Sequence, residues 1–98
     1  MQINYTKEAS VLTVAPEGRI DTMTAPELEK KFSEILDGVT DLVLDMAKVA
    51  YISSAGLRVI LKVQKRMLCQ GSMKLIGVND SIQEVFEITG FSDILNIE

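Results

Sequence analysis

The chain of 98 residues has the apolar content of an ordinary globular protein, 47%, and carries 14 acidic against 10 basic side chains. This length and composition suit one compact domain, residues 1–98, with a real core. The net charge of −4 argues against nucleic-acid binding, which needs clustered Lys and Arg to release counterions. No apolar stretch reaches the roughly 18 residues of a membrane span, and no signal-peptide pattern opens the chain, so we expect a cytoplasmic protein with no membrane partner.

The chain contains no histidine and a single cysteine, Cys69. The absence of histidine removes both the commonest general base and the commonest zinc ligand. A lone cysteine cannot form an internal disulfide, and we expect Cys69 to pack as a small buried hydrophobe. We therefore expect no metal, no cofactor and no catalytic residue.

The first 20 residues predict a hairpin followed by a short third strand. Apolar residues alternate or cluster in β-branched runs over residues 3–14, with a turn at 7–10. Pro16 and Gly18 are expected to break the second strand, since proline cannot donate to a sheet ladder. Only residues 19–20 then remain for a third strand.

A helix is predicted to begin at Thr24. Thr24 and Glu27 have the spacing of a capping box, in which each side chain pairs with a free amide of the first turn. Pro26 is well placed there, because its missing N–H would be unpaired anyway. The inner face of this helix is predicted to consist of Leu28, Phe32, Ile35 and Leu36.

Strands and helices alternate through the rest of the chain. Residues 42–44 predict a central strand covered on both faces. A helix follows, with a predicted inner face of Leu57, Ile60, Leu61 and Leu68 around the polar Gln64. A strand over 73–78 and a helix capped by Asn79-Asp80 and stopped by Gly90 come next.

The order β-β-β-α-β-α-β-α predicts an α/β fold, a mixed β-sheet of four to five strands with helices packed on it. In such sheets the loops at the carboxyl ends of the strands carry function. Two loops, residues 19–24 and 50–56, occupy that position. Within the first, Asp21 is read either as an Asx-type turn or as a contact residue beside the second loop.

Two serines, Ser53 and Ser54, open the helix after the second loop. On local pattern, one of them is an N-cap that accepts a hydrogen bond from a free amide. A hydroxyl at an exposed helix start beside small residues is also accessible to phosphorylation, and the helix dipole favours the added negative charge. Both interpretations stay open at this point.

Three segments resemble one family, in the correct order along the chain. Residues 18–25, Gly-Arg-Ile-Asp-Thr-Met-Thr-Ala, look like the pattern G-x-[LI]-D-x-x-[TN]-[AS]. Residues 51–57, Tyr-Ile-Ser-Ser-Ala-Gly-Leu, are similar to the phosphorylation loop D-S-[ST]-G-[LI]. Residues 85–91 look like a last helix ending in apolar-x-x-[ST]-G-[LF]. The chain thus resembles the bacterial anti-sigma-factor antagonists, stand-alone members of the STAS domain family, along nearly its whole length.

The resemblance implies the STAS fold and a partner-switching function in transcription regulation. Such a protein, unmodified, binds an anti-sigma factor that is also a serine kinase of the histidine-kinase-like ATPase fold, which frees a sigma factor. Phosphorylation releases it, and a serine phosphatase of the 2C type restores it. By position the phosphoacceptor is Ser54, and we expect a monomer or weak dimer. The partner-binding residues implied are Asp21, Thr22, Thr24, Ser53, Ala55, Gly56, Leu57 and Arg58.

The sequence departs from the family pattern at three positions. Ser53 replaces the usual Asp and becomes a rival phosphoacceptor, Ala55 replaces a second hydroxyl, and Arg58 replaces a common glycine. Because position 53 lacks the usual Asp, a second function stays possible for the sequence. In that alternative the chain is a STAS module that binds without being phosphorylated and serves a transporter or a scaffold. An enzyme with Ser54 as nucleophile is disfavoured, because the chain has neither a histidine base nor a G-x-S-x-G elbow.

Overall fold

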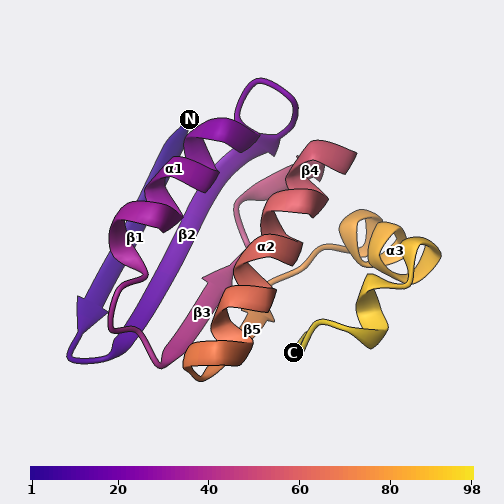
Figure 1. Ribbon diagram of the computed structural model, residues 1–98. Helices are drawn as coiled ribbons and strands as arrows, with labels where there is room; N and C mark the ends of the chain where they lie inside the picture. Colours follow the sequence, from indigo (N-terminus) through magenta and orange to yellow (C-terminus); the bar gives the residue numbers. More distant parts are fainter.

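A computed structural model describes all residues, 1–98, as a mixed five-stranded sheet with helices packed on it (Figure 1). The elements are β1 (Gln2–Glu8), β2 (Val11–Ile20), α1 (Ala25–Ile35), β3 (Asp41–Asp45), β4 (Val49–Ile52), α2 (Ser54–Gln70), β5 (Ser72–Ile76), α3 (Asp80–Thr89) and a final 3-10 turn, η1 (Phe91–Asp93). The predicted α/β class and the mixed sheet are confirmed. No helix is both long enough and apolar enough to cross a membrane.

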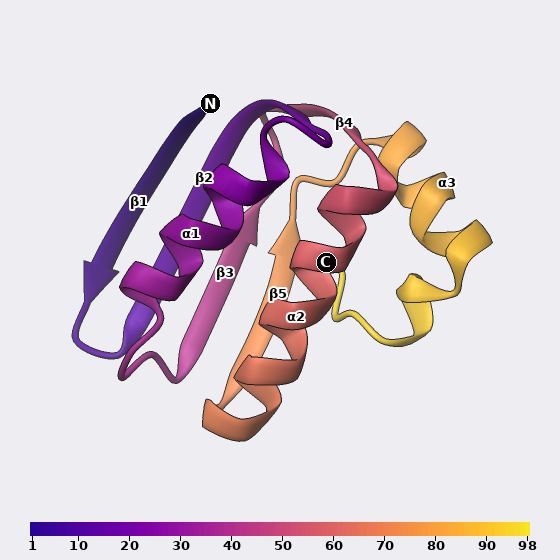
Figure 2. The same cartoon turned by 45° about the horizontal axis from the view of Figure 1, so that its top comes forward.

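Strand β2 organises the sheet. Residues 11–17 of β2 pair antiparallel with β1, and on its other side β2 pairs parallel with β3 over 11–14 and with β4 over 18–20. Strand β5 pairs parallel with β3 on the outer side. Helices α1 and α2 lie side by side across one face of this sheet (Figures 1 and 2). The carboxyl ends of β2 and β4 therefore lie next to each other.

The predicted strand order is wrong at two places. Strand β2 runs unbroken through Pro16, so residues 19–20 are its end and not a separate third strand. Proline is tolerated because it lies between the segments of β2 that pair with β3 and β4, where no parallel ladder needs its amide. The fifth strand is instead β4, most of which falls within the loop predicted over residues 50–56. Its burial pattern, buried only at Val49 and Ile52, lacks the period of two that reveals a strand.

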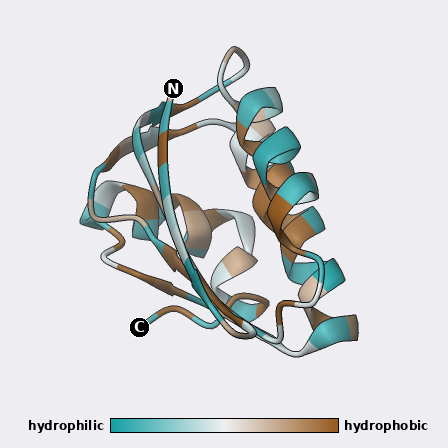
Figure 3. Ribbon diagram, turned by 90° about the vertical axis from the view of Figure 1, so that its left-hand side faces the viewer, coloured by the Kyte–Doolittle hydropathy of each residue, from teal (hydrophilic) through white to brown (hydrophobic).

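One contiguous cluster of buried apolar side chains fills the space between the sheet and the helices. Figure 3 shows the apolar side of the helices turned inward and the polar side turned to solvent. Leu28, Phe32 and Leu36 are buried as predicted, while Ile35 is half-buried. In β3, Leu42 and Leu44 are buried but Val43 is not, so only one face of this strand is fully covered, contrary to prediction.

The inner face of α2 differs from the prediction. Leu57, Ile60 and Gln64 are buried, together with Val63 and Met67, which the prediction omitted. Leu68 is 69% exposed and Leu61 is only half-buried. The buried stripe is centred on Ile60, Val63 and Met67, and Leu68 lies about 100° from Met67, at the margin of that stripe. Cys69, expected in the core, is exposed for the same reason.

Helix ends depend on side-chain caps, and these agree with prediction only in part. Asn79 caps α3 by accepting from the Ile82 amide at 2.8 Å, and Gly90 ends that helix in the left-handed conformation with φ of 80°, as predicted. The capping box at the start of α1 is absent, because the Thr24 side chain makes no cap bond. That hydroxyl is used inside the loop that precedes the helix.

Candidate functional site

The two loops singled out from the sequence meet at one end of the sheet. Ile20, the last residue of β2, pairs with Ile52, the last residue of β4, and the Ser53 amide donates to the Ile20 carbonyl at 2.8 Å. This bond ties the start of α2 to the end of β2. The segments 21–24 and 53–58 are therefore neighbours, as parallel pairing of β2 and β4 requires.

Residues 21–24 form a turn held by Asp21 and Thr24. One carboxylate oxygen of Asp21 accepts from the amides of Met23 at 3.0 Å and Thr24 at 3.1 Å. The Thr24 hydroxyl donates to the Arg19 carbonyl at 2.7 Å and accepts from the Asp21 amide at 2.9 Å. Both side chains thus satisfy backbone groups of the loop itself. This geometry confirms the Asx-type turn and explains why Thr24 does not cap α1.

The hydrogen bond from the Thr24 amide is the main reason that the pKa of Asp21 lies below its ordinary value of 3.8. The Met23 amide, the Thr24 hydroxyl and the Arg19 guanidinium lower that pKa further, and partial burial opposes them. A carboxylate with a depressed pKa stabilises the fold above its unfolded pKa, and this contribution is lost as the pH falls through the folded pKa.

We therefore expect Asp21→Asn to destabilise the domain at neutral pH, because the charged acceptor of two amides is lost. The stability difference between the two proteins should be constant well above the ordinary carboxyl pKa and should shrink as the pH falls through the depressed pKa of folded Asp21. Urea unfolding of both proteins, at neutral pH and at pH values below the ordinary carboxyl pKa, measures the difference. A difference that grows on acidification would contradict the role assigned to Asp21.

The two serines at the start of α2 have different environments. Ser53 is the N-cap residue, and its hydroxyl accepts from the Gly56 amide at 3.4 Å. Ser54 is the first helical residue and is exposed, and its hydroxyl makes no hydrogen bond within the protein. The two readings left open by the sequence therefore fall on different residues: Ser53 caps the helix, and Ser54 offers a free hydroxyl. Serine and aspartate are both strong N-caps, so Ser53 can fill the structural place of the family's usual Asp.

Gly56 and Leu57 hold the helix start against the sheet and lie below the surface. A Cβ atom on Gly56 would be 2.7 Å from side-chain atoms of both Ile20 and Ile52, so only glycine fits without a shift. The Leu57 side chain is 7% exposed and belongs to the core cluster. Both residues were predicted to bind a partner, but they are buried and cannot contact one. They pack the start of α2 against the sheet.

Ala55 and Arg58 line a groove of about 270 Å³ between the start of α1 and the first turns of α2. Thr22, at the tip of the first loop, contributes to the same groove. Its remaining lining residues are Ala25, Pro26, Glu29, Val59 and Lys62. The groove joins the two predicted loops into one surface that runs from the 21–24 turn to Arg58.

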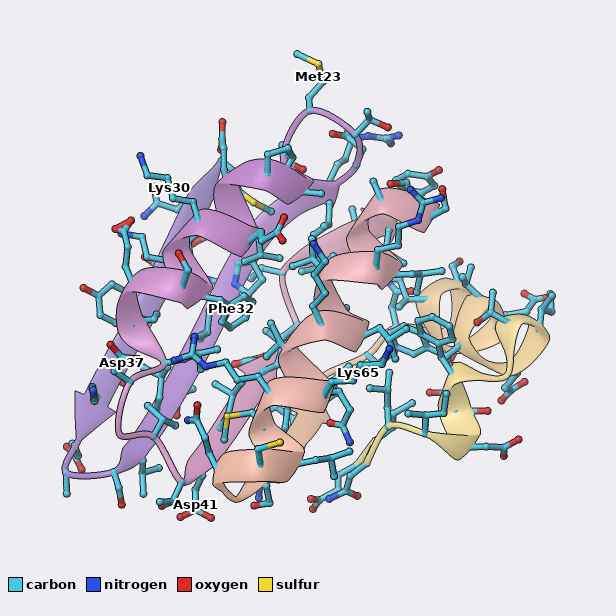
Figure 4. All side chains as sticks on the ribbon, in the orientation of Figure 1. Met23, Lys30, Phe32, Asp37, Asp41 and Lys65 are labelled. Carbon is cyan, nitrogen blue, oxygen red and sulfur yellow. The ribbon has the colours of Figure 1, made fainter.

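Three exposed residues beside this surface were not among the predicted site residues. The Arg19 guanidinium lies over the ring of Tyr51, 4.2 Å from its centroid, and 3.7 Å from the Asp21 carboxylate. Met23 projects from the tip of the first loop, 82% exposed (Figure 4). An exposed methionine in a short loop was visible in the sequence, but the Arg19–Tyr51 contact depends on strand β4. Such Arg, Tyr and Met side chains are typical of protein interfaces.

The chain belongs to the STAS domain family, whose model matches residues 2–98. It is 35% identical over 99 residues to BtrV of Bordetella bronchiseptica, a candidate anti-sigma factor antagonist, covering 99% of this chain and 85% of BtrV. It is 32% identical over 100 residues to the anti-sigma-B factor antagonist of Staphylococcus aureus, covering 99% of this chain and 92% of that protein.

Solved structures share the fold. A candidate anti-sigma factor antagonist of Thermotoga maritima superposes with a TM-score of 0.89 at 24% identity, over 97% of this chain and 84% of the other. The Bacillus cell fate determinant SpoIIAA, solved in its phosphorylated form, gives a TM-score of 0.75 at 14% identity, over 99% of this chain and 91% of the other. These likenesses confirm the STAS fold implied by the sequence motifs.

Proposed function

We propose that this chain is an anti-sigma-factor antagonist whose binding is switched by phosphorylation of Ser54. Relatives at 32–35% identity carry the name of anti-sigma factor antagonists, which supports the general function. In this proposal the unmodified protein, a single domain, binds an anti-sigma factor that is also its serine kinase. The phosphorylated protein is released, and a 2C-type phosphatase restores it.

The observation that carries the choice of site is the difference between the two serine hydroxyls. Ser54 is exposed and free, whereas the Ser53 hydroxyl accepts from the Gly56 amide. In the modification the Ser54 oxygen bonds to the γ-phosphorus of ATP, the bond from that phosphorus to the ADP oxygen breaks, and the hydroxyl proton passes to solvent. SpoIIAA, which shares the fold, has been solved both unphosphorylated and phosphorylated.

The position of Ser54 allows phosphorylation without unfolding. The free amides and the dipole at the start of α2 favour negative charge, and the first turn of α2 contains no acidic residue that would repel a phosphate. The melting temperature should stay within a few degrees of the unmodified value, since dipole effects are typically about 1 kcal/mol or less. Release must then arise at the interface and not from a change in the fold.

The contact surface that we propose consists of the accessible residues of the 21–24 turn and of the start of α2. It comprises Asp21, Thr22, Met23, Thr24, Ser53, Ser54, Ala55 and Arg58, with Arg19 and Tyr51 at its side. Arg, Tyr and Met side chains contribute strongly to protein interfaces, and Ser54 lies within this set. A phosphate on Ser54 would therefore stand inside the contact area.

The choice between the two serines is tested by mass spectrometry after incubation with the cognate anti-sigma factor kinase and ATP. We expect one phosphate on the wild-type protein, none on Ser54→Ala and one on Ser53→Ala. The Ser53→Ala variant should instead be less stable by about 1 kcal/mol, the usual cost of losing an N-cap. Phosphate on Ser54→Ala but not on Ser53→Ala would move the site to Ser53. No phosphate on the wild-type protein would favour the alternative of a module that is not phosphorylated.

A further inference from the structure

We infer that Arg58 is the intramolecular counter-ion of a phosphate on Ser54, an inference that rests on the proposed function. The two residues are four positions apart on α2, so their side chains are neighbours on one helix face. Side chains on a helix lean toward its N-terminus, which directs the Arg58 guanidinium back over the turn that contains Ser54. The geometry of the helix alone thus brings a cation to the phosphate position.

Arg58 is available for this contact because no carboxylate in the structure engages it. Two other cations of α2 are already paired, Lys62 with Glu29 at 2.7 Å and Arg66 with Asp37 at 2.7 Å. Arg58 is exposed and takes part in none of the ion pairs of the protein. Since nothing competes for it, its guanidinium can turn to a new anion without breaking an existing bond.

The order of the two residues is the favourable one. In a helix, an anion four residues before a cation is more stabilising than the reverse order, because this order agrees with the direction of the helix dipole. The planar fork of a guanidinium donates two parallel hydrogen bonds to phosphate oxygens, which an ammonium group cannot do. The Asp21 carboxylate, the nearby anion of the other loop, is occupied by the amides of its own turn.

This contact gives phosphorylation a second effect on the surface. Arg58 lines the groove between α1 and α2, so in the unmodified protein it offers that groove a free cation. In the phosphorylated protein the cation is held by the phosphate, and the pair keeps a net negative charge. A carboxylate of the partner that pairs with Arg58 before modification therefore meets an anion afterwards.

The test uses protein with phosphoserine genetically encoded at position 54, so that no kinase is needed. The second pKa of the phosphate, normally about 6, is measured by ³¹P NMR titration. We expect the Arg58→Gln substitution to raise this pKa by about 0.5, Arg58→Lys to raise it less, and about 1 M salt to remove most of the difference. The matched control is Lys65→Gln, because Lys65 is another exposed cation of α2 (Figure 4) but lies about 16 Å from Ser54 along the helix axis.

Equal phosphate pKa values in the wild-type protein and Arg58→Gln would overturn the inference, as would an equal rise in Lys65→Gln. Because Arg58 is exposed, the unphosphorylated Arg58→Gln protein should melt like the wild type, which separates loss of the contact from loss of the fold. The outcome is independent of the proposed function. If the kinase fails to modify Ser54, the function fails while the titration still reports on Arg58.

Discussion

Replacing Ser54 by Asp is expected to weaken binding of the anti-sigma factor by more than about a hundredfold. Ser54 lies within the proposed contact surface, so the added carboxylate must enter a contact from which water is excluded. An unpaired charge buried in this way typically costs about 3 kcal/mol or more, which corresponds to more than about a hundredfold in affinity. Titration calorimetry with the purified partner measures the effect directly.

The matched control for this substitution is Ser54→Ala, which removes the hydroxyl without adding charge. It should bind about as tightly as the wild type and, because it cannot be phosphorylated, should stay bound when ATP is present. The Asp variant should fold normally, since a carboxylate at the first position of a helix is favourable. Equal affinity of the folded Asp and Ala variants would refute charge at position 54 as the switch.

Most elements of the fold were predictable because their patterns are local. The 3.6-residue period of α1 places Leu28, Phe32 and Leu36 inside, and both ends of α3 follow from the preferences of Asn79 and Gly90. The features that the sequence pattern did not predict, the unbroken β2 and the strand β4, depend on pairing between distant segments. Proline in the middle of β2 is acceptable only because β3 and β4 leave a gap opposite it, and that gap is a property of the sheet.

The candidate site was predictable in position but not in detail. The rule that loops at the carboxyl ends of strands converge was enough to bring Asp21 and Ser54 together. The separate roles of Ser53 and Ser54 required the hydrogen bond between Ser53 and the Gly56 amide, and the burial of Leu57 required the packing of α2. The Arg19–Tyr51 contact could not be predicted from the sequence. It follows from the register of β2 with β4, and the sequence pattern did not predict β4 as a strand.

Gly71 ends α2 and is also constrained by a close backbone neighbour. It follows α2 immediately, and its amide donates to the Met67 carbonyl at 2.6 Å. A Cβ atom at this position would lie 1.9 Å from the Thr40 carbonyl oxygen and 2.7 Å from its carbonyl carbon. The same oxygen accepts from the Ser72 amide at 2.9 Å, which joins the start of β5 to the segment before β3. A side chain at 71 cannot be accommodated by rotating a flexible group, because the obstacle is backbone.

We therefore expect Gly71→Ala to cost about 3 kcal/mol, at the upper end of overpacking effects, and to lower the melting temperature by more than about 10 °C. The matched control is Gly38→Ala. Gly38 has a φ of 77° and no atom within 4 Å of the added Cβ, so that substitution should cost only about 1 kcal/mol from backbone strain. Thermal and urea unfolding of both variants compare the two effects. A larger loss for Gly38→Ala than for Gly71→Ala would mean that backbone conformation, and not the contact with Thr40, sets the need for glycine after α2.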